Sequence, residues 1–237
     1  MHTRTFNLPT LLAGCVLALL SVAGVSVAQT NTTAPATTKK EVTADKHVTD
    51  AVKVVQRMLE EPRMKELLAQ AKGIFIVPTY GQVAVGVGAS GGAGVLLTKR
   101  SDGSWGEPAF YNIGGISAGV QIGAEGGPIA MVLNNDKAVS KFMQKNAFAL
   151  NAAAGLTLVN WSKIAQSGVG DGDVVVWSGA KGLYGSLVSV GVSDIRYSQK
   201  LTDAYYHQSV AIADALAGKY PNAQSESLRQ TLAVAPR

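Results

Sequence analysis

The apolar residues between Ala44 and Lys72 repeat at helical spacing. Four of them follow one another at intervals of four, three and four residues: Val48, Val52, Val55 and Leu59. This spacing forms one stripe and predicts an amphipathic helix that begins near Ala44. Pro62 interrupts the stripe. Because proline is tolerated in the first turn of a helix, Pro62 predicts the start of a second short helix that runs to about Ala71.

After Lys72 the pattern changes to short runs of apolar and β-branched residues. Six such runs predict the strands of an antiparallel meander: Ile74–Val77, Val83–Gly88, Gly94–Thr98, Ala109–Ile113, Ser117–Ala124 and Ile129–Leu133. The segment Ser101-Asp102-Gly103-Ser104 predicts a hairpin turn, and Gly126-Gly127-Pro128 predicts a break between strands.

The rest of the chain mixes both patterns. Asn135 is expected to cap a helix, and strand character returns over 148–159, 174–178 and 183–192. Two or three helical turns are expected from Gln199 to Ala217. Residues 221–237 are expected to form a frayed tail.

Glycine is concentrated in the strand region, with 15 of the 26 glycines between Gly73 and Gly127. Glycine inside a strand costs about 0.5–1 kcal/mol relative to alanine, so this density indicates bulges, coiling or close backbone approach. The predicted fold class is therefore α+β. It consists of a glycine-rich, strongly coiled, mainly antiparallel sheet or barrel-like core with N-terminal amphipathic helices and a C-terminal helix.

The first residues have the pattern of an export signal. Arg4 precedes an apolar run from Leu11 to Val27, and Ser26-Val27-Ala28 places small side chains where signal peptidase cleaves. We therefore expect a signal peptide over 1–28 and a periplasmic or envelope location. Residues 29–43 lack apolar periodicity and predict a flexible tether, which leaves 44–220 as the domain.

Leu12-Ala13-Gly14-Cys15 also fits a lipoprotein box, in which Cys15 would be acylated and would anchor the protein to a membrane. Cleavage before Gln29 and lipidation at Cys15 remain two alternatives. Cys15 is the only cysteine, so the domain has no internal disulfide and no thiolate metal site.

The net charge and the motifs of the chain limit the binding and catalytic functions that it can have. The chain carries 21 basic and 16 acidic residues, too weak a positive balance to indicate nucleic-acid binding. Gly86-Val87-Gly88-Ala89-Ser90-Gly91 fits a dinucleotide fingerprint, but the sequence after it predicts another strand and not the required helix. Asp171-Gly172-Asp173 lacks the ligand spacing of a calcium loop and predicts a turn. We expect no catalytic residues, no metal site and no cofactor.

One face of the first predicted helix is cationic. Lys46, Lys53 and Arg57 lie within roughly 40° of one another, opposite the apolar stripe. This face is either a solvated surface, diluted by Asp50 and Glu60, or a contact for an anionic bilayer.

Several segments, taken in order, resemble the SYLF family, also called the Ysc84 actin-binding domain. They are Ala71–Pro78, Gly86–Leu96, Trp105–Phe110, Gly114–Gly123, Met131–Ala138 and Lys181–Gly185. The similarity extends from about Ala44 to Tyr206. It implies a non-enzymatic protein that binds membrane phospholipids, phosphoinositides in eukaryotic members, through a basic amphipathic N-terminal segment, and that binds actin in fungal members.

The resemblance makes Lys46, Lys53 and Arg57 candidate lipid contacts, with Lys65 and Lys72 as secondary contacts. An export signal would separate the chain from cytoplasmic actin and phosphoinositides. The expected partner is therefore an anionic phospholipid surface in the envelope. The alternative is an envelope structural or protein-interaction module without direct lipid affinity.

Overall fold

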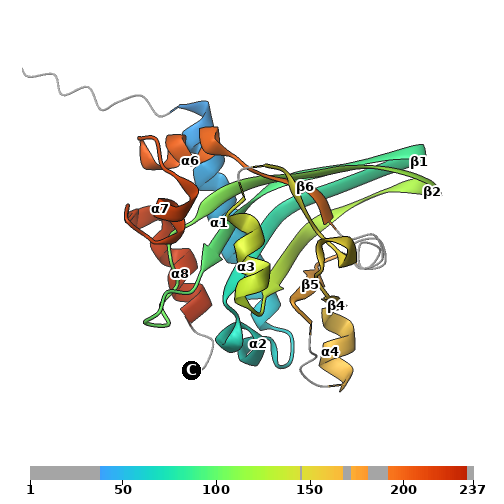
Figure 1. Cartoon of the computed structure of the whole chain (residues 1–237), viewed down its shortest axis with the longest axis horizontal. Helices are drawn as coiled ribbons and strands as arrows, with labels where there is room; N and C mark the ends of the chain where they lie inside the picture. The colour runs from blue at the N-terminus through green and yellow to red at the C-terminus, as the bar shows by residue number, and fades with distance from the viewer. Residues whose placement is uncertain (1–37, 145, 168–171, 181–191, 234–237) are drawn as a thin grey trace, which may run out of the picture. The chain divides into compact units, whose positions relative to one another are not determined.

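The computed structural model describes residues 38–144, 146–167, 172–180 and 192–233 (Figure 1). The helices are α1 (Lys39–Leu59), α2 (Met64–Gln70), α3 (Asp136–Phe142), α4 (Trp161–Ser167), α6 (Gln199–Tyr206), α7 (Ile212–Leu216) and α8 (Glu226–Ala233). The strands are β1 (Gly73–Thr98), β2 (Ala109–Leu133), β3 (Phe148–Leu150), β4 (Leu158–Asn160), β5 (Val174–Ser178) and β6 (Val192–Tyr197). Within these residues, no helix is both long and apolar enough to span a membrane.

The two long strands each reverse direction halfway along their length. β1 and β2 pair antiparallel almost from end to end. Nevertheless, a Cβ atom built on Gly94 would lie 2.1 Å from the carbonyl oxygen of Ile76. A straight strand would separate these residues by about 60 Å, so the ribbon must double back between them. The register shift between Val85 and Val87 lies where this reversal is required.

The six strands consequently supply eight segments of one mostly antiparallel sheet. β5 pairs with residues 129–133 of β2, whereas β6 pairs with residues 111 and 112. Of the strand pairs described, only β4 with β5 is parallel. The predicted fold class is confirmed: the protein is α+β, its sheet is nearly closed into a barrel, and helices lie at both ends of the described chain.

The predicted meander is wrong in its connections. The six expected runs belong to two strands that fold over together, and the expected break at Gly126-Gly127-Pro128 lies inside β2. The hairpin turn at Ser101–Ser104 is confirmed, with Gly103 at φ 80° and the Arg100 N–H donating to the Ser104 carbonyl.

The remaining expectations were met in part. Asn135 caps α3 by accepting a hydrogen bond from the Ala138 N–H. The strand expected over 148–159 is instead β3, a 3-10 turn at Ala152–Ala154 and the start of β4. β5 and the helices after Gln199 are confirmed, whereas most of the strand expected over 183–192 lies outside the described residues.

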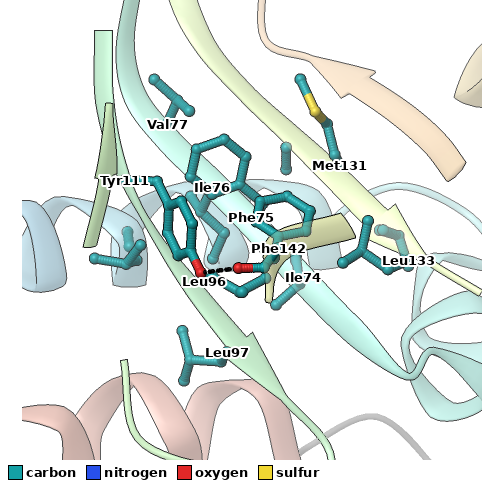
Figure 2. Close-up of a cluster of buried hydrophobic side chains, with 14 of the residues drawn as sticks. Ile74, Phe75, Ile76, Val77, Leu96, Leu97, Tyr111, Met131, Leu133 and Phe142 are labelled. Atoms are coloured by element: carbon teal, nitrogen blue, oxygen red, sulfur yellow. Dashed lines mark hydrogen bonds between the residues drawn. The ribbon is translucent and has the colours of Figure 1, made fainter. Parts of the chain in front are cut away.

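The hydrophobic core lies at one end of the folded ribbon. Figure 2 shows side chains from Ile74–Val77 beside Leu97 on one side and Met131 and Leu133 on the other. The ring of Phe75 makes edge contacts with Tyr111 and Phe142, and the Tyr111 hydroxyl donates to the Phe142 carbonyl at 2.6 Å. These contacts fix α3 on the sheet.

The first helix begins earlier than predicted. Thr38 and Glu41 form a capping box, in which each side chain accepts a hydrogen bond from the other residue's backbone N–H. α1 therefore starts at Lys39, and residues 39–43 of the expected tether are helical. The second helix begins at Met64, two residues after Pro62.

The expectation of a frayed tail over 221–237 is wrong for its central part. Residues 226–233 form α8, whose Leu228 and Leu232 side chains are fully buried. The carboxylate of Glu107, also fully buried, accepts hydrogen bonds from the Ser225 hydroxyl at 2.5 Å and from the Arg229 guanidinium at 2.6 Å. This buried ion pair and the two leucines hold α8 on the domain.

Replacing Gly94 with Ala should lower the free energy of unfolding by about 1–3 kcal/mol, the usual cost of overpacking, because the new methyl group meets the Ile76 carbonyl. Gly81 is the matched control, since a Cβ there meets nothing within 4 Å. Urea denaturation of both variants measures the difference. Equal stabilities would contradict the close approach of the two halves of β1.

Replacing Arg229 with Met should destabilise the protein by about 2–4 kcal/mol, because the Glu107 carboxylate would lose its buried counter-charge. The control is Lys219→Met, which removes an exposed ion pair with Asp214. Thermal unfolding followed by circular dichroism compares them. If the Arg229 variant is as stable as the control, the ion pair does not hold α8.

Candidate functional site

The apolar face of α1 points into the protein. Its six buried residues are Ala44, Val48, Ala51, Val54, Val55 and Met58. They pack against β1, α6 and α8. Two residues of the predicted stripe, Val52 and Leu59, are only partly buried at its margin. The helix is therefore amphipathic because it docks on its own domain, and its exposed surface is polar except for Val42, which is 55% exposed.

Two predicted site residues, Lys46 and Lys53, lie together on this exposed face. Both side chains are 70% exposed and both pair with the carboxylate of Asp50. The Lys53 ammonium donates to Asp50 at 2.9 Å. Hydrogen bonds from Lys46 and then Lys53 lower the pKa of Asp50. The cluster Lys46–Asp50–Lys53 therefore carries a net charge near +1 at neutral pH.

A third lysine lies on this face and was not among the predicted site residues. Lys39 lies seven residues before Lys46, which itself lies seven residues before Lys53, so all three fall on nearly the same side of α1. Lys39 is exposed. The seven-residue repeat was the available signal, and placing the helix start at Ala44 concealed it. We call Lys39, Lys46 and Lys53 the α1 lysine row.

Arg57 does not belong to this row, although its side chain is exposed. Its guanidinium donates to the Gly179 carbonyl at 2.9 Å and lies 5.8 Å from the centre of the Trp177 ring. Arg57 thereby ties the last turn of α1 to the end of β5. Its assignment as a lipid contact stays a prediction.

The secondary candidates lie on different elements. Lys65 is exposed on α2, and Lys72 is exposed between α2 and β1. The backbone of Lys72 pairs with Lys99, whose ammonium donates to the carbonyls of Leu68 and Ala69 at 2.8 and 2.6 Å. Burial and the nearby Lys72 charge lower the pKa of Lys99. Lys99 caps the C-terminal end of α2, whereas Lys65 and Lys72 keep exposed ammonium groups.

The described residues contain no group of His, Cys, Asp or Glu that could hold a metal ion. Residues 86–91 lie within β1 and open no helix, which removes the dinucleotide interpretation. Asp173 is a structural residue, since its carboxylate accepts hydrogen bonds from the Thr157 backbone and the Asn135 side chain. Cys15 and Asp171 lie outside the described residues.

A shallow groove of about 430 Å³ lies beside α6. Its lining comes from Tyr206–Gln208 and Lys219–Gln224. Lys219 in this lining pairs with Asp214, and His207 lies beside Glu41. The groove therefore offers no net positive charge to an anionic ligand, and the α1 lysine row is the stronger candidate.

Replacing Lys46 and Lys53 together with Met should raise the pKa of Asp50 toward its ordinary value, because both hydrogen-bond donors are lost. A lowered pKa in the folded state stabilises the fold above the ordinary carboxyl pKa, and this contribution is lost as the pH falls through the lowered value. Exposed pairs contribute only about 0.2–1 kcal/mol each. Carboxyl NMR titration measures the shift, with Lys200→Met as control, and an unchanged Asp50 pKa would contradict the pairing.

Comparison with known proteins agrees with the resemblance found in the sequence. The Ysc84 family, described as "Las17-binding protein actin regulator", matches residues 114–235. The chain is 26% identical over 170 residues to "SH3 domain-containing YSC84-like protein 1" of Homo sapiens and of Rattus norvegicus, covering 70% of this chain and 49% of each relative. It is also 26% identical over 170 residues to "Protein YSC84" of Saccharomyces cerevisiae, covering 69% and 36%.

The chain thus spans about half the length of the mammalian relatives. No solved structure matches it. The description of the family names a protein that its members bind and a role in actin regulation. It names no enzymatic reaction. Because the match covers more than half of the chain and includes most of β2 and all of β5, β6 and α8, this protein belongs to the Ysc84 (SYLF) family.

Proposed function

We propose that this protein is an exported, non-catalytic protein that binds anionic phospholipid head groups in the cell envelope. The observation that carries this proposal is the α1 lysine row, in which Lys46 and Lys53 keep 70% of their side chains exposed on a helix fixed to the domain. Because the three lysines lie on one docked helix, their backbone positions are fixed relative to the domain.

The strength of this contact follows from its charge. Each lysine near an anionic bilayer contributes about 1 kcal/mol, so the three lysines supply about 3 kcal/mol, and Asp50 offsets part of it. Lys65 and Lys72 add charge where they reach the same surface. Since the apolar face of α1 is buried under α6 and α8, this helix contacts lipid through its lysines and not by burying its apolar stripe.

Export is part of the proposal and is supported by the sequence alone. The apolar run Leu11–Val27 and the small residues before Gln29 favour cleavage at that position, and Cys15 provides the alternative of a lipid anchor. The intact mass of the mature protein distinguishes the two, because only cleavage before Cys15 adds acyl groups.

The second candidate is a protein-interaction module of the envelope. It is favoured by the family description, which names a protein ligand for Ysc84 proteins. Such a module would retain its protein partner at high salt and would have no affinity for vesicles. Head-group binding instead predicts affinity for anionic vesicles. This affinity should fall as the salt concentration rises, because counter-ions screen exposed charges.

The chain from Gln29 onward contains the whole compact unit Thr37–Arg237 and is the form to test. Reversing Lys46 and Lys53 to Glu should reduce co-sedimentation with phosphatidylcholine:phosphatidylglycerol vesicles (3:1) at least tenfold, because attraction becomes repulsion. The matched control reverses Lys141 and Lys200, which changes the net charge equally on other helices. Two results would overturn the head-group mechanism. One is an equal loss of binding in both variants, and the other is equal binding of the parent protein to neutral and anionic vesicles.

Asp50→Asn provides the opposite test on the same surface. Removing this carboxylate frees both lysines and should strengthen binding to anionic vesicles about fivefold, the effect of roughly one unit charge. The gain should disappear in about 0.5 M salt. A weaker binding of this variant would show that the ion pairs position the lysines instead of competing for them.

A further inference from the structure

We infer that a pH-sensitive contact holds the first turns of α1 against the C-terminal end of α6. The contact comprises Glu41 and Asp45 of α1 and His207, the C-cap residue of α6. The two helices pack against each other (Figure 1). The contact tightens as His207 and Asp45 take up protons and loosens as the pH rises. The inference is independent of lipid binding, because it concerns only how firmly α1 is held.

The two carboxylates lie close together in a sheltered position. Glu41 and Asp45 are four residues apart, so they lie on the same side of α1. The Glu41 side chain is only 14% exposed. Oδ1 of Asp45 is buried and accepts no hydrogen bond from any described residue. Two like charges at this spacing destabilise a helix, so a counter-charge would strengthen the contact.

His207 supplies that counter-charge only when it is protonated. Its Nε2 lies 3.5 Å from Oε1 of Glu41, and its charge also acts on Asp45. The His207 side chain is 65% exposed, so it exchanges protons with water freely. Histidine is the side chain that ordinarily changes charge near neutral pH. The net charge of the three groups therefore depends on the pH.

The uncharged groups beside Asp45 do not replace this counter-charge. The Gln224 side chain forms a hydrogen bond with Asp45 and brings no charge. The buried hydroxyl of Tyr205 on α6 also lies near Asp45. Burial, and then the charges of Glu107 and Asp45, raise the pKa of Tyr205 far above its usual value, so this hydroxyl stays neutral.

Three permanent cations on the surrounding elements pair with other carboxylates. They are Lys46 of α1 with Asp50, Lys219 beside the groove with Asp214, and Arg229 of α8 with Glu107 and Glu226. Within the described residues, the charges that act on Asp45 are those of Glu41 and His207. Protonation of His207 therefore decides whether the two carboxylates have a counter-charge.

Acid strengthens the contact in two ways. Burial raises the pKa of Asp45 by more than the Gln224 hydrogen bond lowers it, and the Glu41 charge raises it further. A carboxyl group whose pKa is raised in the folded state stabilises the fold below its ordinary pKa, and this contribution is lost as the pH rises through the raised value. Protonation of His207 acts in the same direction, because it gives Glu41 an ion-pair partner.

The contact holds a part of α1 that no buried side chain anchors. Residues 39–43 contain no buried side chain, and Ala44 is the first residue of the helix that is buried. Glu41 also completes the capping box, since its Oε2 accepts a hydrogen bond from the Thr38 N–H at 3.2 Å. Loosening Glu41 should therefore fray the first turn of α1, which carries Lys39.

A nitroxide label on the Val42→Cys protein measures this fraying, because the chain from Gln29 onward has no other cysteine. Val42 is 55% exposed, so a label there should leave the contact intact. Raising the pH from 5 to 8 should increase the mobile fraction in the electron paramagnetic resonance spectrum about threefold, the effect of losing one charge interaction on a helix surface. The label on Met143→Cys, 43% exposed at the C-terminal end of α3, should not respond.

Two further variants test the titrating groups. His207→Gln cannot form the positive charge, so at pH 5 its label at position 42 should stay nearly as mobile as at pH 8. Asp45→Asn removes the buried charge and keeps the shape of the side chain, so it should raise the melting temperature at pH 8 by about 2 °C, and by less at pH 5. Asp214→Asn is the matched control, because its carboxylate already has Lys219 as a partner, and it should raise the melting temperature at neither pH.

An unchanged mobility of the label at position 42 between pH 5 and pH 8 would overturn the proposal. A full pH response in His207→Gln, or a lower melting temperature of Asp45→Asn at pH 8, would overturn it as well. These measurements contain no lipid, so their outcome is separate from that of the vesicle experiments.

Discussion

The close backbone contact between the two halves of β1 is the constraint on which the rest of the fold depends. Gly92 and Gly94 lie against Thr79 and Ile76 at distances that a side chain would prevent. Because β2 pairs with β1 almost throughout, it must follow the same reversal. One end of β2 then accepts β6 and the other accepts β5, which places these strands on opposite sides of the folded ribbon.

The helices depend on that arrangement in turn. Bringing Ile74–Val77 beside Leu96 and Leu97 creates an apolar surface large enough to bury one whole face of α1. α8 then packs on α1, and its Arg229 pairs with Glu107, which lies on the connection between β1 and β2. The ion pair thus joins the C-terminal helix to the loop that the folded ribbon positions. Removing Arg229 leaves the Glu107 carboxylate, which is fully buried, without its counter-charge.

The sequence pattern correctly predicted the features that depend on contacts between residues close together in the chain. The helical spacing of α1, the Asn135 cap and the turn at Ser101–Ser104 depend on neighbouring residues, and the structure confirms them. The glycine content indicated close backbone approach, although it did not show that the two halves of β1 approach each other. The reversal within β1 was not predictable, because its residues, such as Val83 and Val85, continue to favour strand. α8 was missed because its buried face consists mainly of Leu228 and Leu232, and its stability comes from the distant Glu107.

The candidate site shows the same difference between features set by neighbouring residues and features set by distant contacts. Charge and helical position correctly placed Lys46 and Lys53 on one exposed face, but only the fold shows that Arg57 is engaged by Gly179 and that Asp50 is shared. The fold also shows that the apolar stripe of α1 is already buried. A membrane contact that relied on α1 alone would therefore be electrostatic and weak.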